Sequence, residues 1–214
     1  MFIRSLLNAK YLRYEDFSVG QFVEATIDCV LPAGVSVSVG VNLKGFIHKL
    51  HWADDPRLKR PELRFKVGGS VTCRVLKNVL ERKSLYLTCK NTLVVDKGPI
   101  YQEPSQLEKK TALKGTVALI QTSGLLITFY GDLTGWIPLA RLAKRGLSER
   151  SFFLGQIVSC VVESVSDVGK VVLDLDKSGY ETAQTDKGLG SIVECRVVKV
   201  NAEEGHRGLE VTCC

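Results

Sequence analysis

Apolar and small polar residues alternate along several short stretches in the first part of the chain. The stretches Phe22–Ile27 and Val35–Val39 both have a period of two, which is typical of a strand with one buried face. Similar patterns follow at Ser70–Leu76 and Ser84–Thr88, and Gly45-Phe46-Ile47 lies between the two pairs. The pattern predicts five short strands within about 70 residues.

The second part of the chain repeats this pattern. Three blocks recur at a separation of 90 residues: Ala25-Thr26-Ile27 with Gly115-Thr116-Val117, Gly34 with Gly124, and Gly45-Phe46-Ile47 with Gly135-Trp136-Ile137. Further on, Phe65–Gly68 matches Phe152–Gly155 at a separation of 87, because the first copy has three more loop residues. Self-similarity at a fixed spacing indicates two copies of one structural unit.

Five short strands with a long connection between the third and the fourth are typical of an OB-like fold. In this fold, closure into a barrel removes the open edges of the sheet. We therefore predict an all-β protein of tandem five-stranded OB-fold barrels with short helical linkers. The expected parts are a linker over 1–17 that can form a short helix, a repeat over 18–94, a linker over 95–107, a repeat over 108–176 and an incomplete third repeat over 187–214.

Charge divides the two repeats. Residues 18–94 hold twelve Lys and Arg against six Asp and Glu, a net charge of +6, whereas 108–176 hold eight against seven, a net charge of +1. The whole positive excess therefore lies in the first repeat and favours a polyanionic partner. The alternative is a solvated basic face that binds nothing.

The cysteines and the apolar runs exclude several classes of protein. Seven cysteines, an odd number without a C-x-x-C pair, argue against a disulfide framework and against a zinc site. They suit a reducing compartment, cytosol or nucleus. Met1–Tyr14 lacks the apolar core of a signal peptide, and no apolar run approaches the roughly 18 residues of a membrane span.

The inventory of reactive side chains predicts no enzyme. The three histidines, His48, His51 and His206, have no hydrolase, metalloprotease or Walker-type motif around them. Asp54-Asp55 precede Pro56, where adjacent carboxylates are typical of a polar turn. We expect no cofactor, no metal and no small-molecule substrate.

The order of motifs resembles the S1 RNA-binding domain. The matching segments are Gly45-Phe46-Ile47-His48, Phe65-Lys66-Val67-Gly68 and Leu87-Thr88-Cys89-Lys90 in the first repeat, and Gly135-Trp136-Ile137-Pro138 and Phe153-Leu154-Gly155 in the second. The resemblance covers about two-thirds of the chain and implies barrels that bind single-stranded RNA.

Other segments are similar to one eukaryotic family of multi-S1 proteins. They are Ala9–Tyr14 ahead of the first repeat, Cys73–Leu76 and Lys90–Leu93, which resemble the middle repeats of the nucleolar rRNA biogenesis family (ribosomal RNA-processing protein five). This resemblance implies binding to precursor rRNA, contacts with pre-ribosomal proteins, and a location in the nucleus and nucleolus.

Candidate RNA contacts follow from the S1 pattern and from charge. The aromatic positions of the family hold Ala33 and Ser36 in the first repeat and Ser123 and Leu126 in the second, none of which offers a ring. We expect Phe46 and Trp136 to belong to the core. Cations near strands three to five can neutralise phosphates, and a histidine can stack or donate. The candidates are Lys44, His48, Lys49, Arg74, Lys77 and Lys90 in the first repeat and Arg141, Lys144 and Arg145 in the second.

Two functions remain open at this point, while the family-like linker segments argue against a third, an S1 appendage of a ribonuclease or transcription factor. The first is an RNA-binding segment of a ribosome-biogenesis factor, in which the first repeat supplies most of the affinity. The second is a protein-interaction scaffold whose S1 repeats have lost contact with RNA, which the missing aromatic residues favour. The second repeat suits a spacer or protein-docking role, because Pro138 replaces the histidine and its net charge is close to zero.

Overall fold

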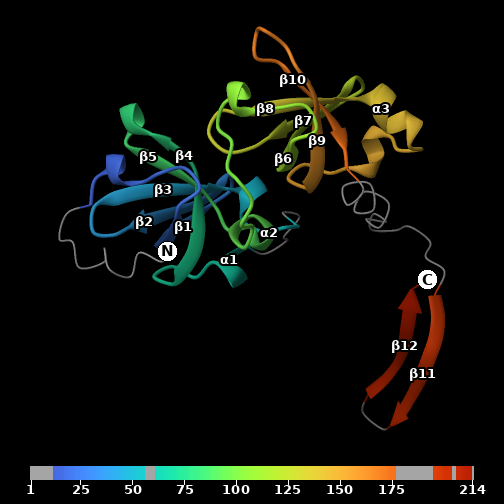
Figure 1. Ribbon diagram of the computed structural model, residues 1–214. Coiled ribbons are helices and arrows are strands. Elements are labelled where there is room, and N and C mark those ends of the chain that lie inside the picture. The colour runs from blue at the N-terminus through green and yellow to red at the C-terminus, as the bar shows by residue number, and fades with distance from the viewer. Residues whose placement is uncertain (1–11, 56–60, 177–194, 204–205, 214) are drawn as a thin grey trace.

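The computed structural model describes residues 12–55, 61–176, 195–203 and 206–213, and contains two closed five-stranded barrels and one separate hairpin (Figure 1). The predicted all-β class and the tandem barrels are confirmed. The expected helix at 5–13 lies largely outside the described residues. Residues 187–194 of the expected third repeat also lie outside the described residues. The rest of that segment contains a hairpin of β11 (Cys195–Glu203) and β12 (His206–Cys213).

The first barrel joins its strands in the order β1-β2-β3-β5-β4, and pairing of β1 with β4 closes it. All neighbours are antiparallel except β3 and β5, which run parallel. The bounds are β1 Phe22–Leu31, β2 Gly34–Val39, β3 Leu43–His48, β4 Ser70–Val79 and β5 Ser84–Thr88. Short helical turns are η1 Tyr14–Asp16, η2 Lys49–His51, α1 Pro61–Arg64, η3 Leu80–Arg82 and α2 Asn91–Val94.

The second barrel has the same topology, with the order β10-β8-β7-β6-β9. Its strands are β6 Ala112–Gln121, β7 Gly124–Thr128, β8 Thr134–Pro138, β9 Ile157–Val165 and β10 Val171–Leu175. The helical turns are η4 Pro104–Gln106, α3 Leu139–Lys144 and η5 Glu149–Ser151. Both barrels therefore place their long connection between the third and fourth strands, as the repeat predicts.

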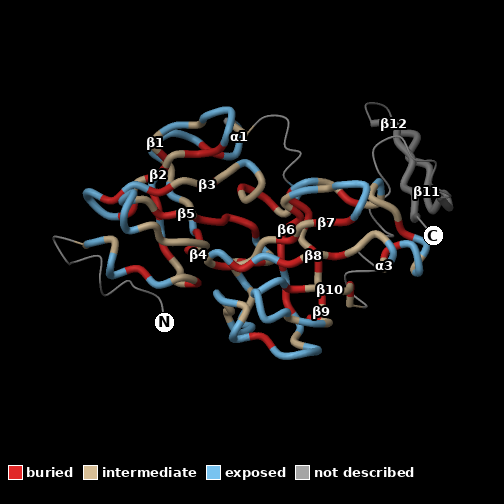
Figure 2. Tube along the Cα trace, turned by 90° about the horizontal axis from the view of Figure 1, so that it is seen from above, coloured by how far each residue is buried: buried red, intermediate tan, exposed pale blue. Residues whose placement is uncertain are grey.

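Alternate residues of each strand point into the barrels, and Figure 2 shows the buried positions recurring along the strands. In the first barrel Val35, Val37 and Ile47 are fully buried. Leu125, Ile127 and Ile137 hold the corresponding positions of the second. Each barrel thus has its own apolar core, and the remaining strand positions form an outer face.

Several cysteines are part of these cores. Cys73 and Cys89 are buried with their Sγ atoms 3.3 Å apart, and Cys160 is fully buried in the other barrel. The hydrogen bond with Cys89, together with burial, raises the pKa of Cys73, so it remains a thiol. These residues pack as small apolar side chains.

Candidate nucleic-acid interface

The outer face of the first barrel holds a row of side chains that crosses several strands. Ser36 on β2 pairs with Phe46 on β3, and Phe46 pairs with Tyr86 on β5. Tyr86 in turn pairs with Lys77 on β4. Because paired residues face the same side of a sheet, these four residues form one continuous row, with two aromatic rings at its centre.

Phe46 lies outside the barrel, so the expectation that it belongs to the core is wrong. The residues before and after it, Gly45 and Ile47, are buried, whereas Phe46 is half-buried. Its ring covers Gly34, where an added Cβ would come within 2.8 Å of the ring and 2.2 Å of the Ile47 carbonyl oxygen. The absence of a side chain at Gly34 therefore allows the ring to lie over this part of the sheet.

His48 extends this aromatic surface at the end of β3. Its ring meets the Phe46 ring edge to face, with 6.4 Å between the centroids. Its Nδ1 accepts a hydrogen bond from the Leu50 backbone N–H at 3.2 Å. Desolvation and the neighbouring charge of Lys49 lower its pKa. The imidazole is therefore neutral at pH 7 with its proton on Nε2, which leaves that group as a donor.

Two of the predicted lysines lie close to this surface, Lys44 two residues before Phe46 on β3 and Lys49 next to His48. Lys44 is paired across β2 and β3 with Ser38, and its side chain remains 65% exposed while Nζ lies 3.1 Å from an Asp28 oxygen. Desolvation raises the pKa of Asp28, but hydrogen bonds from Ser38 and Lys44 outweigh it, so the net pKa is lowered. Lys49 is exposed. An exposed ion pair of this kind is weak, so Lys44 can exchange Asp28 for a phosphate.

Arg74 is in the joint between the barrels rather than on this surface, and burial removes it from the set of phosphate contacts. It is 6% exposed. Its guanidinium donates to the carbonyl oxygens of Gly20, Leu93 and Asp96 at 2.7, 2.9 and 2.7 Å. It also lies over the rings of Phe22 and Tyr130, at 5.0 and 5.3 Å from their centroids. Tyr130 belongs to the second barrel, so Arg74 holds the two units together.

Lys90 is likewise buried in the joint and is not available to RNA. It is fully buried, and Nζ donates to the carbonyl oxygens of Ala53, Asp54 and Gly155. Burial lowers its pKa to about 8, against the opposing effect of the Asp54 and Asp55 carboxylates. Gly155 belongs to the second barrel, and a further bond joins Gly131 N–H to the Leu76 carbonyl at 2.8 Å.

The remaining predicted cations are mostly paired with carboxylates. Lys77 forms an ion pair with Asp132 of the second barrel. Arg141 pairs with Glu163, and Arg145 lies 3.0 Å from Asp174. Lys144 is exposed at the end of α3. The basic cluster predicted in the second repeat is therefore largely neutralised by its own barrel.

The second barrel carries an apolar row in the positions of the aromatic row. Leu119 on β6 pairs with Leu126 on β7, Leu126 pairs with Trp136 on β8, and Trp136 pairs with Val172 on β10. Trp136 is half-buried over Gly124, so it too lies outside the core. Leu119 is 41% exposed. This face offers one large ring among aliphatic side chains.

Sequence reasoning missed Phe46 and Tyr86 as a paired platform. The family positions on the second strand hold Ala33, in the exposed turn between β1 and β2, and Ser36. The rings come instead from β3 and β5, which are far apart in the sequence. The alternation Leu85-Tyr86-Leu87 marks Tyr86 as outward-facing, but the partner of that strand is visible only in the barrel.

No group of three metal-ligating side chains occurs among the described residues. In the same part of the chain, no helix is long and apolar enough to cross a membrane.

No protein-family model matches the chain. It is 35% identical to the rRNA biogenesis protein rrp5 of Schizosaccharomyces pombe over 76% of its length, and 30% identical to the RRP5 homolog of Mus musculus over 97%. It spans about a tenth of those relatives, 10% and 12% of their lengths. The small ribosomal subunit protein bS1 of Rickettsia typhi is 25% identical over 82% of the chain and 30% of its own length.

Among solved structures, the a/eIF2alpha-aDim2p-rRNA complex from Pyrococcus horikoshii aligns over 36% of this chain and 46% of its own, with 18% identity and a TM-score of 0.33. The two closed barrels and the similarity to RRP5 and bS1 sequences agree with each other. The chain is thus a run of S1-type OB-fold repeats that resembles a segment of the RRP5 proteins.

Proposed function

We propose that this chain is an RNA-binding segment of a ribosome-biogenesis factor, acting on precursor rRNA during pre-ribosome assembly. The observation that carries the proposal is the in-register pair of Phe46 and Tyr86 on the outer face of the first barrel, flanked by His48 and Lys44. Aromatic faces on a barrel surface with lysines beside them suit a single strand, whose bases stack and whose phosphates are neutralised.

Each residue of this surface has a distinct role. Successive bases stack on Phe46 and Tyr86, for about 1–3 kcal/mol per base. The Nε2–H of His48 donates to a base edge or a phosphate. Lys44 and Lys49 neutralise phosphates, so the affinity falls steeply with salt. The names of the relatives, rRNA biogenesis protein and RRP5 homolog, support precursor rRNA as the natural strand. A protein that acts on precursor rRNA is expected in the nucleolus.

A salt titration of fluorescent single-stranded RNA tests this proposal. We expect Lys44→Glu with Lys49→Glu to lower the affinity at least about tenfold and to reduce the slope of log K against log salt by roughly 0.7 per lost phosphate contact. The matched control reverses two exposed cations of the second barrel, Arg150→Glu with Lys170→Glu, and should change the affinity much less. Equal losses in both double variants would reject the first barrel as the binding face.

A second candidate function applies to the other barrel. The apolar row of Leu119, Leu126, Trp136 and Val172 favours contact with a pre-ribosomal protein, since the centre of a protein interface is apolar and poor in charge. If the whole chain bound RNA no better than a protein of matched charge, the scaffold function would replace RNA binding as the better explanation of both barrels.

A further inference from the structure

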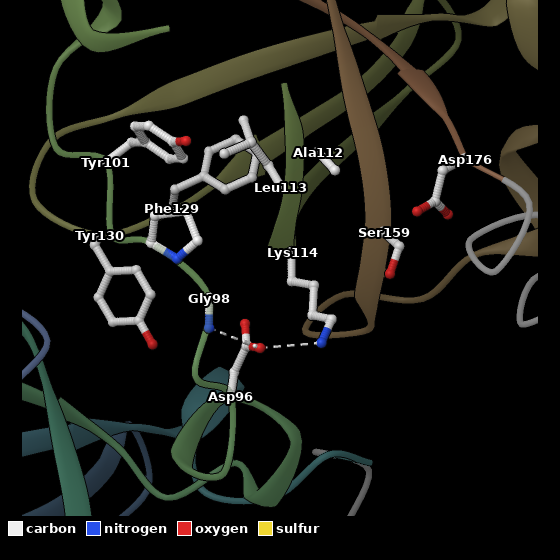
Figure 3. A pocket seen from close by; sticks show the side chains of 11 residues that line it. Asp96, Gly98, Tyr101, Ala112, Leu113, Lys114, Phe129, Tyr130, Ser159 and Asp176 are labelled. Atoms are coloured by element: carbon white, nitrogen blue, oxygen red, sulfur yellow. Dashed lines mark hydrogen bonds and ion pairs between the residues drawn. The ribbon is translucent and has the colours of Figure 1, made fainter. Parts of the chain in front are cut away.

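A cavity of about 300 Å³ lies between the inter-barrel linker and the second barrel. Its walls come from linker residues 96–101, the start of β6, the loop after β7, and Ser159 and Asp176 on the far side (Figure 3). None of its lining residues belongs to the outer rows described above. Its volume is at the lower end of the roughly 300–1,000 Å³ range of small-ligand pockets, so it suits a single small group.

One side of this cavity is aromatic. Figure 3 shows Tyr101 and Phe129 next to each other, with Tyr130 below them. Tyr101 and Phe129 are half-buried and pack on the core of the second barrel. Tyr130 is fixed from behind, because its hydroxyl donates to the Leu93 carbonyl at 3.4 Å and Arg74 lies over its ring. A planar group entering the cavity therefore meets rings that are already held in place.

The polar part of the cavity combines acceptors and a donor. Lys114 Nζ lies 3.2 Å from an oxygen of Asp96, and both side chains remain partly exposed, at 42% and 26%. The Arg74 guanidinium donates to the backbone carbonyl oxygen of Asp96, which fixes the backbone from which the carboxylate extends. Ser159 adds a hydroxyl on the opposite wall. A carboxylate and an ammonium side by side present complementary partners for a ligand edge that carries both donors and an acceptor.

The repeat itself explains why the cavity is open. The first barrel has Phe22 and Arg74 at the positions that Ala112 and Val161 occupy in the second, and the Arg74 guanidinium lies over the Phe22 ring. In the second barrel the ring is replaced by an exposed alanine that lines the cavity. Ala112 and Val161 therefore leave more room at this place in the second barrel than the larger Phe22 and Arg74 leave in the first.

We propose that this cavity binds one unpaired nucleobase of single-stranded RNA, and that guanine is the best match. The proposal rests on the RNA-binding function proposed above. Guanine N1–H and N2–H₂ donate to the Asp96 carboxylate while O6 accepts from Lys114, and the ring stacks on Tyr101 or Phe129. Only a base that has left a duplex can enter, because the cavity takes one base edge and one face.

Other ligand chemistries fit less well. A phosphate would face the carboxylates of Asp96 and Asp176, and only Lys114 among the lining residues would attract it. A cationic side chain would find those carboxylates but would be repelled by Lys114. A neutral planar group with both donors and acceptors uses the rings, the carboxylate and the ammonium together.

Amide chemical shifts of the full chain, measured by NMR during titration with nucleoside monophosphates, test the site directly. We expect GMP to shift the amides of Gly98, Lys114 and Ser159, and AMP, CMP and UMP to shift them less. Ala112→Phe should abolish the GMP shifts, because the new ring would fill the cavity that Ala112 lines. The first barrel carries a phenylalanine at the corresponding position, Phe22, so the fold should accept the change. The control Gln121→Phe adds a ring at an exposed position near the far end of the same strand and should leave them intact.

Affinity for RNA separates failure of this proposal from failure of the proposed function. Ala112→Phe should weaken binding of a guanine-containing strand by roughly fivefold or more, and leave an all-uridine strand of equal length unchanged. Unchanged guanine-strand binding alongside the loss in the Lys44→Glu, Lys49→Glu variant would overturn the cavity and keep the platform. Absence of any RNA binding would overturn both. The base pocket would also be overturned if GMP shifted only amides of the first barrel. The same holds if an arginine tripeptide, but not GMP, shifted the amides that line the cavity.

Discussion

The two barrels share one fold and differ on one face. From β1 to β5 the first barrel shows Cys29, Ser36, Phe46 and Tyr86, and the second shows Leu119, Leu126, Trp136 and Val172 in the same register. Inside, both are filled by aliphatic residues. Since inward positions are constrained by packing and outward ones are not, the outer face is where duplicated barrels are free to diverge in function.

The same contrast extends to charge. The cations of the first barrel's face, Lys44 and Lys49, are exposed, whereas Arg141 and Arg145 of the second are paired with Glu163 and Asp174. The net charge of a repeat alone does not distinguish exposed cations from cations paired with carboxylates. Lys44 has only a largely exposed ion pair with Asp28 to give up to a phosphate chain, whereas Arg141 and Arg145 would have to leave partners in ion pairs that are mostly buried.

The largest expected effect tests what the barrels share. Gly34→Ala and Gly124→Ala should each lower the free energy of unfolding by more than about 3 kcal/mol, because the new Cβ would lie 2.2 Å from the Ile47 or Ile137 carbonyl oxygen. Urea unfolding monitored by circular dichroism measures the loss. Gly68→Ala is the control, since its φ of +80° makes it strained but nothing lies within 4 Å; about 1–2 kcal/mol is expected there. A similar loss at all three positions would reject the steric explanation.

The next effect concerns the joint, where Arg74 in the first barrel corresponds to Val161 in the second. Arg74→Met should cost about 3 kcal/mol of stability, because two buried carbonyl oxygens and a partly buried one lose their donor. It should also let the barrels tumble separately, which NMR relaxation measures as shorter rotational correlation times. Arg82→Met, at an exposed hairpin, should stay within about 0.5 kcal/mol of the parent. Unchanged tumbling in Arg74→Met would show that other contacts fix the joint.

Acid should destabilise the first barrel through His51, whose counterpart 90 residues on is Arg141. Desolvation and the charge of Lys90 lower the pKa of His51 to about 3, so the folded ring stays neutral when the unfolded one, with a pKa of about 6.5, takes up a proton. Stability therefore falls as the pH drops below the unfolded pKa, by about 2 kcal/mol from pH 7 to pH 5. Urea midpoints at both pH values measure this. His51→Gln should lose much less, and an equal loss would assign the effect to other groups.

The smallest effect comes from exchanging one residue of the two rows. Tyr86→Val gives the first barrel the residue of the second and should weaken single-stranded RNA binding by about 1 kcal/mol, roughly fivefold. Val172→Tyr makes the reverse change and should strengthen it by less, since the second barrel has Thr134 and Leu139 at the positions of Lys44 and Lys49. Both residues favour strands, so the fold should persist. Fluorescence anisotropy at fixed salt measures the pair, and a larger effect at Val172 would reverse the roles of the two barrels.

Much of the fold was predictable because its signals are local. Alternation along Val35–Val39 and a spacing of 90 residues fix the strands and the duplication without any knowledge of contacts. The basic bias of the first repeat was equally visible. Lys44, His48 and Lys49 were predicted on or just after the third strand, and the structure places Lys44 and His48 on β3 and Lys49 directly after it.

Other residues were misjudged because the sequence shows neither register nor burial. Arg74 and Lys90 are cations in or next to basic, strand-rich segments, which is also the pattern of a phosphate contact. Docking of the second barrel places the Tyr130 ring against Arg74 and gives Lys90 the Gly155 carbonyl oxygen as an acceptor. The other acceptors of both cations come from the first repeat and the linker. Phe46 was expected in the core because it is large and apolar. On the outer face, however, Gly34, diagonally across on β2, leaves room for its ring.

The sequence by itself determined the strands, the repeat and the sign of the charge, since these depend on residue type and on short-range periodicity. Tertiary structure decided which strands are neighbours, and therefore that Phe46 meets Tyr86 across parallel strands separated by forty residues of chain. It also decided which cations are buried and where a cavity remains between the linker and the second barrel. These properties depend on distances between segments that are remote in the chain, which closure of the barrels and their docking alone establish.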